Sequence, residues 1–269
     1  MGAPLDSLVG RGPEPPPVQI GDVLADKYVV ERMLGVGGMG VVVAARHMDL
    51  NELRAIKLMR RDASADSGAV ERFLREARAA VRLKSQHAVK VHDVGRLDSG
   101  EPYMVMEYLE GTDLKGVLRS RGPLPIAETV GLVLQAVEAI AEAHSIGIVH
   151  RDLKPGNLFL TTELDGTPFV KVLDFGISKL TAGEGAGLDM TKTSSMLGTP
   201  YYMSPEQMRS SRQVDARTDV WALGVILYQL LTGRVPFKEE TITALCVTVI
   251  QDEPVPPRQR RPDIPPELE

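Results

Sequence analysis

The sequence predicts an α+β protein built from two parts, a small part rich in β-strands and a larger part made mainly of helices. Short β-branched runs separated by turn-prone segments occupy residues 28–59 and return in residues 88–109, a pattern typical of an antiparallel sheet. After residue 112 this pattern stops, and long apolar segments with helical punctuation follow. The 269 residues suffice for two parts that each bury a core. A cleft between two such parts is a favoured ligand site.

The first part is expected to hold three strands, one helix and two further strands, in that order. Residues 69–83 carry apolar side chains at helical spacing, so this segment should form a helix with one buried face. The members of that face are Val70, Phe73, Leu74, Ala77 and Val81. The strands are expected at residues 28–30, 41–44, 54–59, 88–97 and 102–109.

Two long helices are expected in the second part. Residues 126–147 are apolar at helical spacing, and Pro125 and Gly147 stand at the two ends, as is usual where a helix begins and ends. Residues 219–233 are apolar almost all round, which predicts a buried helix that ends at its glycine. The only cysteine, Cys246, lies in another apolar helical stretch and is expected to be buried.

The composition is that of an ordinary soluble globular protein, with 43% hydrophobic and 25% charged residues. A formal net charge of −5 argues against a nucleic-acid partner, because a nucleic-acid binder needs a basic face. One cysteine excludes an internal disulfide and suits the reducing cytoplasm. No run of about 18 apolar residues exists, so no membrane span is expected. Residues 1–20, rich in Pro and Gly and without a signal peptide, are expected to be a disordered lead-in.

A glycine-rich segment between the first two strands carries the first chemical motif. Gly35, Gly37 and Gly40 follow the pattern G-x-G-x-x-G, which lets backbone N–H groups approach phosphate oxygens. Alone, the pattern also fits a plain hairpin turn. The glycines lead into the strand run at residues 41–43 and not into a helix, which argues against a dinucleotide-binding fold. A Walker loop is excluded because no Gly-Lys-Ser/Thr follows.

The second motif is Lys57, which stands between Ile56 and Leu58 on a predicted strand. Alternation along the strand points Lys57 away from both apolar neighbours, so a solvated lysine is the plain interpretation. The glycine segment upstream favours a different one, in which Lys57 is a cation that faces a phosphate. Glu76 on the following helix is a candidate partner, although a surface glutamate is the usual alternative there.

The third motif places polar groups between two apolar runs in residues 147–160. Phosphoryl transfer from a nucleotide needs a carboxylate to orient the attacking hydroxyl and cations to absorb charge. Asp152 suits the carboxylate role, and Lys154, two residues on, can reach the transferred phosphate. Asn157 offers a hard oxygen for Mg²⁺. A solvated turn is the alternative.

The fourth motif is Asp174, which ends an apolar strand and precedes Phe175 and Gly176. A carboxylate at a strand end, beside a glycine that bends freely, is well placed to hold Mg²⁺. In isolation Asp-Phe-Gly is a common turn sequence, so the motif gains its meaning from its place after Asp152.

Together these motifs resemble the catalytic domain of protein kinases over residues 28–255. The resemblance rests on GVGGMGVV, AIK, Glu76, HRDLKPGN, DFG and the segment MSPE. Lys154 and the stretch GTPYYMSPEQ are similar to the Ser/Thr kinases, and GGMG, SPEQ and DARTDVWALG to the eukaryotic-type Ser/Thr kinases of bacteria. The resemblance implies a bilobal α+β fold with an antiparallel-sheet N-lobe and hinge at residues 21–109 and a mainly helical C-lobe at residues 110–269.

The resemblance also implies the activity and the partners. The cofactors would be ATP and Mg²⁺, and the γ-phosphate would pass to Ser or Thr hydroxyls of protein substrates. Arg151, next to Asp152, favours an anionic partner such as a phosphothreonine, which indicates activation by autophosphorylation at Thr191 and Thr193. Self-association of two copies for trans-autophosphorylation is a further expectation. The rival hypotheses are a pseudokinase scaffold and a small-molecule phosphotransferase.

By the same resemblance, each motif residue receives a role. Asp152 would be the catalytic base, with Lys154, Lys57 and Thr199 beside it, and Asn157 and Asp174 would hold Mg²⁺. The nucleotide would contact Leu34, Gly35, Val36, Gly37, Gly38, Met39, Gly40, Val42, Ala55, Lys57, Glu76, Met106, Glu107, Leu109, Asp113 and Phe159.

Within that set, the parts of the nucleotide are divided between different residues. Val42 and Ala55 would cover the adenine from above and Phe159 from below. Met106 would be the gatekeeper, the backbone of Glu107 and Leu109 would bind adenine, and Asp113 would reach the ribose.

Two further residues, Asp219 and Trp221, look structural: Asp219 should brace the catalytic loop from the buried helix, and Trp221 should pack in the core. The sequence also departs from the family pattern. It ends where the family normally adds two more helices, so the C-lobe is expected to be truncated and Glu206 to lack its usual partner.

Overall fold

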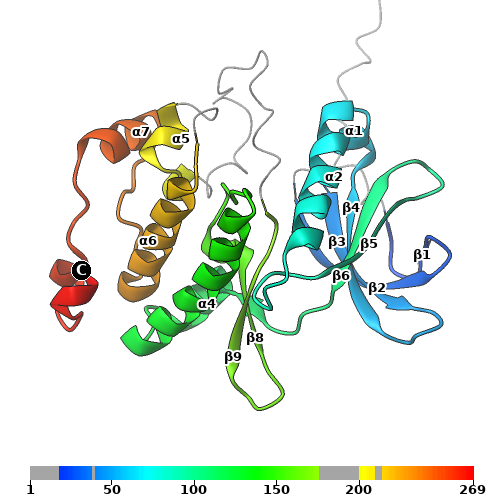
Figure 1. Ribbon diagram of the computed structural model, residues 1–269, viewed down its shortest axis with the longest axis horizontal. Helices are drawn as coiled ribbons and strands as arrows, with labels where there is room; N and C mark the ends of the chain where they lie inside the picture. The colour runs from blue at the N-terminus through cyan, green and yellow to red at the C-terminus, as the bar shows by residue number, and fades with distance from the viewer. Residues whose placement is uncertain (1–17, 38–39, 176–199, 210–213) are drawn as a thin grey trace, which may run out of the picture.

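The computed structural model describes residues 18–37, 40–175, 200–209 and 214–269. It has two lobes, as predicted, with a strand-rich N-terminal lobe beside a mainly helical one (Figure 1). The N-lobe sheet is antiparallel and has the strand order β1-β2-β3-β4-β6-β5. Its strands are β1 (Val23–Leu24), β2 (Tyr28–Val36), β3 (Gly40–His47), β4 (Leu53–Met59), β5 (Val91–Arg96) and β6 (Pro102–Glu107). All five predicted strands are present, and the first three are longer than the β-branched runs that predicted them.

The helices of the N-lobe are α1 (Arg61–Ser64) and α2 (Ser67–Arg82). α2 begins at a capped end, because the side chain of Asp66 accepts a hydrogen bond from Gly68 N. The helix covers one face of the sheet, where Phe73 and Ala77 pack against Met104 and other buried side chains of β4 and β6. The opposite face of the sheet forms a second core.

The buried face of α2 is rotated slightly from the predicted one. Val81, predicted to be buried, is 60% exposed, whereas Ala80 and Glu76 are buried. Glu76 lies three residues after Phe73 and four before Ala80, so it shares their face of the helix. A glutamate on a buried face needs a cation, and Lys57, its candidate partner from the sequence, supplies one.

The second lobe packs helices around a three-stranded sheet with the order β7-β8-β9. Its core lies between α4, α6 and β9, and α6 ends at Gly233, whose φ of +76° is left-handed. The elements are β7 (Thr112–Asp113), α3 (Leu114–Arg121), α4 (Ile126–Ser145), η1 (Pro155–Asn157), β8 (Leu158–Thr162), β9 (Pro168–Val172), η4 (Pro200–Tyr202), α5 (Pro205–Arg209), α6 (Arg217–Thr232), α7 (Ile242–Gln251), α8 (Pro257–Arg260) and η5 (Pro266–Leu268).

Two predictions of burial and one of disorder need correction. α6 is not buried all round, because Val220 in its first turn is 62% exposed. Cys246 is only partly buried, at the edge of a small cluster with Phe237. Val18, inside the predicted lead-in of residues 1–20, is buried in the N-lobe core, so the ordered chain includes it. Residues 1–17 lie outside the described residues.

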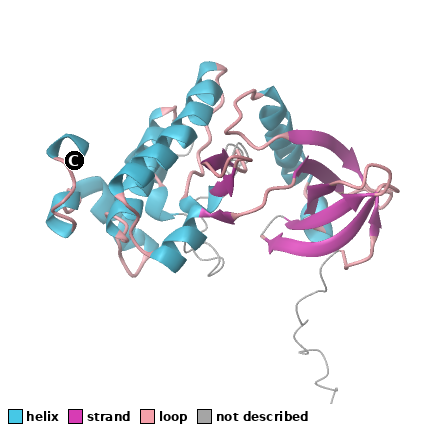
Figure 2. Cartoon of the chain, turned by 90° about the horizontal axis from the view of Figure 1, so that it is seen from below, coloured by secondary structure: helices cyan, strands magenta, loops and turns pink. Residues whose placement is uncertain are grey.

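The two lobes are joined by backbone hydrogen bonds between β9 and the segment after α2. Val89 N donates to Val172 O at 3.0 Å, and Val172 N donates to His87 O at 2.7 Å. The ring of His87 also lies 2.9 Å from Val170 O and stacks on Phe169. Seen from below, the small sheet lies between the N-lobe sheet and the helices (Figure 2). Among the described helices, none has the length and apolarity to cross a membrane.

Candidate active site

Lys57 lies on the α2 face of the N-lobe sheet and not in solvent. In the β3–β4–β6 ladder it stands opposite Val42 and Met104, so all three share one face of the sheet. Ile56 and Leu58 point to the opposite face and are buried in the second core. The solvated-lysine interpretation is therefore wrong.

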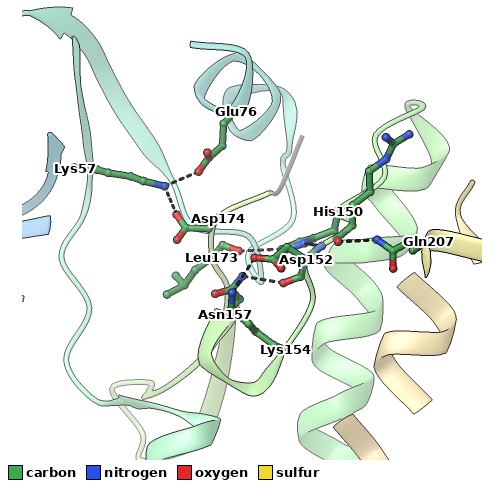
Figure 3. Close-up of polar contacts among 10 residues, drawn as sticks. Lys57, Glu76, His150, Asp152, Lys154, Asn157, Leu173, Asp174 and Gln207 are labelled. Atoms are coloured by element: carbon green, nitrogen blue, oxygen red, sulfur yellow. Dashed lines mark hydrogen bonds and ion pairs between the residues drawn. The ribbon is translucent and has the colours of Figure 1, made fainter. Parts of the chain in front are cut away.

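Two carboxylates from different lobes converge on the Lys57 ammonium (Figure 3). Lys57 Nζ lies 2.7 Å from Glu76 Oε1 on α2 and 2.7 Å from Asp174 Oδ1 after β9. Burial lowers the pKa of Lys57, but the two carboxylates outweigh burial and leave this pKa raised. Burial raises the pKa of Glu76 to about 7, with Lys57 opposing this shift and Asp174 adding to it. Desolvation by the surrounding groups raises the pKa of Asp174, but the Lys57 ammonium outweighs this effect and leaves the pKa lowered.

The loop after α4 is held by the buried side chain of Asp219 on α6. Asp219 Oδ2 accepts from His150 N at 2.8 Å, and Oδ1 accepts from Arg151 N at 2.8 Å. His144 Nε2 lies 2.8 Å from Asp219 Oδ2. Arg151 has a φ of +66°, a left-handed conformation that costs energy for a residue with a side chain and that these bonds stabilise. The prediction that Asp219 braces this loop is confirmed.

His150 links this loop to the end of β9. Its Nε2 lies 3.0 Å from Leu173 O, which can only accept, so the ring proton resides on Nε2. Burial lowers the pKa of His150, which keeps the ring neutral. Asp152 N lies 3.3 Å from His150 Nδ1, the acceptor nitrogen of that tautomer. The neutral histidine therefore fixes the positions of Asp152 and of Leu173, the residue before Asp174.

Three predicted residues of the loop lie together. Lys154 Nζ is 2.8 Å from Asp152 Oδ2, and Asn157 Nδ2 donates to Asp152 O at 2.9 Å. Leu173 N donates to Asn157 O at 2.8 Å, which brings the strand that carries Asp174 alongside. Figure 3 shows Asp152, Lys154, Asn157 and Asp174 around one region, with Lys57 approaching from the other lobe.

Asn157 and Asp174 form a donor set that fits Mg²⁺. Because Asn157 Nδ2 donates to Asp152 O, its Oδ1 is the amide atom available as a ligand. Asp174 is exposed and supplies carboxylate oxygens. Within the described ranges, no group of three or more His, Cys, Asp and Glu is arranged to hold a metal. One carboxylate and one amide suit Mg²⁺, which is usually bound by few protein ligands together with substrate phosphates.

The predicted adenine side of the site lies on β4, β6 and the small sheet. Ala55 and Met106 are buried and stand opposite each other in the β4–β6 ladder. Glu107 N donates to Lys90 O at 3.0 Å, so the N–H of this residue already has a backbone partner. Phe159 on β8 stands opposite Asp113 on β7. Leu34 and Val36, at the end of β2, are exposed.

Comparison with known proteins decides the family. Residues 28–263 match the protein kinase domain. The chain belongs to the protein kinase family. It is 42% identical over 244 residues to the serine/threonine-protein kinase pkn3 of Myxococcus xanthus and 37% identical over 249 residues to PknB of Mycolicibacterium smegmatis, in each case over 91% of this chain. It spans only 44% and 39% of the length of those two relatives.

The kinase fold is confirmed by a solved structure. The Mycobacterium tuberculosis PknI kinase domain matches with a TM-score of 0.65 and 29% identity, over 92% of this chain and 86% of that one. The predictions for Gly38, Met39, Thr191, Thr193 and Thr199 lie outside the described residues.

The kinase glycine motif contains glycines with different physical demands. A Cβ at Gly40 would lie 2.0 Å from Leu58 O on the neighbouring strand. Among the described residues, nothing lies within 4 Å of a Cβ at Gly35, and only Gly40 O, at 3.8 Å, lies near one at Gly37. Gly40 is thus required by the packing of β3 on β4. Gly35 and Gly37 leave open space, as a ligand-covering segment needs.

Gly40→Ala is therefore expected to destabilise the domain by more than about 3 kcal/mol, the upper end for overpacked sites, because the clash involves backbone. Gly35→Ala, the matched control, should change the free energy of unfolding by less than about 1 kcal/mol. Denaturant unfolding monitored by circular dichroism measures both values. Equal stabilities for the two variants would contradict this assignment.

Sequence reasoning missed two residues that support the loop after α4, which carries Arg151 and Asp152. Gln207 Nε2 donates to Arg151 O at 3.0 Å, and His144 contacts Asp219 from the last turn of α4. Both belong to segments already singled out, but a contact between segments is not visible in either one alone.

Glu206, which the sequence analysis expected to lack its usual partner, is half-buried. Its charge contributes to raising the pKa of Arg217, after the larger effect of Asp215.

Proposed function

We propose that this domain is an ATP-dependent protein kinase that transfers the γ-phosphoryl group of ATP to Ser or Thr hydroxyls of proteins. The observation that carries the proposal is the convergence of Lys57, Asp152, Lys154, Asn157 and Asp174 from two lobes. Such transfer requires positioning and charge stabilisation more than covalent chemistry by the protein. Charged groups fixed in advance, as these are, supply both.

In this mechanism each group has one task. Asp152 orients the attacking hydroxyl and accepts its proton. Lys154, which already contacts Asp152, stabilises charge on the transferred phosphoryl group, and Lys57 binds the other phosphates. Mg²⁺, when bound by Asp174 and Asn157, would offset the negative charge of the phosphates.

Two rival functions remain distinguishable. A pseudokinase scaffold usually lacks Lys57, Asp152 or Asp174, and this chain has all three. A small-molecule phosphotransferase needs only a small acceptor pocket. Here a cavity of about 1380 Å³ opens beside Lys154, with Tyr201 and Phe237 in its wall, and its size supports a polypeptide acceptor.

Incubation with Mg·ATP and a generic basic protein tests the proposal, with the Asp152→Asn variant alongside. The proposal predicts labelled protein with the wild type and none with the variant. Nucleotide binding without transfer would indicate the scaffold instead, and labelling of small molecules alone would indicate the third function.

Autophosphorylation of Thr191 and Thr193 belongs to the same proposal. Arg151 is adjacent to Asp152; its Nη2 donates to Val214 O at 3.2 Å, while Nε and Nη1 are buried without a hydrogen-bond partner in the part of the chain that is described. A phosphothreonine offers acceptor oxygens and about two negative charges to such a group. Two copies must meet for transfer in trans, so self-association is part of this proposal. A cytoplasmic location suits the need for ATP and the single cysteine.

Mass spectrometry of the purified protein after incubation with Mg·ATP is expected to find phosphate on both threonines. The Thr191→Ala, Thr193→Ala double variant should lose most of its activity, since Arg151 then has no anionic partner. The matched control is the Ser194→Ala, Ser195→Ala double variant, which should stay active. Absence of phosphate from both threonines in an active preparation would contradict the prediction.

A further inference from the structure

We propose that Lys171 is a positioning residue of the nucleotide site, which acts by holding the hinge residue Glu107 against the floor of that site. The inference rests on the proposed ATP-dependent function. Lys171 lies on β9 in the second lobe, and Glu107 ends β6 in the first. Lys171 Nζ is 2.8 Å from Glu107 Oε1, so this ion pair joins the two lobes.

Glu107 is held on two sides. Its Oε1 also accepts from Lys90 N at 2.8 Å, and its own N–H donates to Lys90 O at 3.0 Å. The Lys90 backbone therefore fixes Glu107 within the N-lobe, while Lys171 ties the same carboxylate to the C-lobe. A side chain clamped in this way also fixes the direction of its backbone carbonyl, the group proposed to bind adenine.

The position of Lys171 within the small sheet connects it to the floor of the site. Asp113 stands opposite Phe159 in the β7–β8 ladder, and Phe159 stands opposite Lys171 in the β8–β9 ladder. Directly paired residues of an antiparallel sheet point to the same face. Lys171 thus shares a sheet face with the proposed ribose contact and the proposed adenine floor, and links that face to the hinge.

Burial makes the contact specific for a charged partner. The side chain of Lys171 is 9% exposed and that of Glu107 is 21% exposed. The Lys171 ammonium also lies 5.6 Å from the centre of the Phe169 ring. A buried ammonium is stable only when it is paired, so the chain keeps the lobes at the spacing that preserves this contact.

The test compares the affinities of the Lys171→Met variant for adenosine and for ADP by calorimetry. Methionine keeps the apolar stem and removes the charge. Because the hinge contacts the base, both ligands should lose affinity by the same factor, roughly three- to tenfold, as for side chains that modulate a site they do not touch. The Lys57→Met variant should instead weaken ADP binding and leave adenosine binding unchanged.

Steady-state kinetics give a second, independent test of the inference. The KM for ATP of the Lys171→Met variant should rise by a similar factor with kcat within about twofold, since the phosphate end of the site is unchanged. Lys171→Arg should restore part of the affinity. The matched control is Arg46→Met, which breaks the ion pair of Arg46 with Glu31 in the N-lobe sheet and should leave both affinities unchanged.

Folding is measured separately by thermal unfolding, so a stability effect is not mistaken for a positioning effect. If Lys171→Met does not fold, the Lys171→Met, Glu107→Gln double variant removes both charges and leaves no buried ion unpaired. The inference is overturned if folded variants bind adenosine as the wild type does, or if Arg46→Met loses as much. Because adenosine affinity is measured without phosphoryl transfer, a failure of the proposed kinase activity would be seen separately.

Discussion

Replacing Lys57 with methionine is expected to reduce phosphoryl transfer by about 10²- to 10³-fold, the effect of losing one preorganised charge-stabilising group. The reason is structural as well as electrostatic. Lys57 Nζ separates the carboxylates of Glu76 and Asp174, each 2.7 Å away. Without the ammonium, two negative charges face each other at the cleft, and Glu76 remains buried. A radiolabel transfer assay measures the loss.

The stability of the same variant should depend on pH up to a higher pH than that of the wild type. Burial already raises the pKa of Glu76 from 4.5 to about 7, and removal of Lys57 takes away the main opposing influence. A raised carboxyl pKa stabilises the folded state below the unfolded value and loses that contribution as the pH rises through the folded value. The variant should therefore lose stability, relative to the wild type, as the pH rises above about 7, because Glu76 of the wild type ionises there while Glu76 of the folded variant stays protonated.

Lys84→Met is the matched control, because Lys84 is an exposed lysine just beyond α2. It should keep both the transfer rate and the pH profile of the wild type. A Lys57→Met protein with unchanged transfer, or with the same pH profile as the control, would show that the Lys57 ammonium does not hold these carboxylates.

Asp219→Ala is expected to destabilise the domain by about 3 to 5 kcal/mol, the range for removing one partner from a buried, charge-assisted network. Asp219 is 1% exposed and accepts from two consecutive backbone N–H groups, those of His150 and Arg151. Its loss leaves both donors buried and unpaired. It also removes the bonds that hold Arg151 in its left-handed conformation, so the loop with Asp152 should relax and transfer should stop.

Asp215→Ala provides the comparison. Asp215 is an exposed aspartate paired with Arg217 near the start of α6, and an exposed ion pair contributes little to stability. Chemical denaturation of both variants measures the difference. If Asp219→Ala were as mild as Asp215→Ala, the loop would not depend on α6 for its geometry.

Local sequence patterns predicted the order of elements and that the polar groups of the loop with Asp152 lie together. Alternation and turn residues located the strands, and the helix of residues 219–233 was placed within two residues of α6 (Arg217–Thr232). Asp152, Lys154 and Asn157 were predicted to act together because they fall within six residues of one loop, and the structure joins them by hydrogen bonds. Such features depend on neighbours in the chain, which a sequence displays.

What the sequence could not reveal depends on contacts between distant segments. Strand alternation alone allowed Lys57 to be solvated. Glu76 was a candidate partner, but the second contact of Lys57, with Asp174 at the end of β9, spans 117 residues of the chain. The pairing of Lys171 with Glu107 spans 64 residues, and neither residue is unusual in its own segment. The steric demand at Gly40 arises from the carbonyl of Leu58 on the adjacent strand.

The most direct test of the catalytic geometry is a comparison of ATP affinity and single-turnover transfer rate in wild type and Asp152→Asn. Asparagine keeps the size of the side chain and can still contact Lys154, but it accepts a proton poorly. We expect nearly unchanged ATP affinity and a transfer rate lower by about 10²- to 10⁴-fold, the contribution of a general base. A transfer rate equal to that of the wild type would contradict the assignment of Asp152 as the proton acceptor.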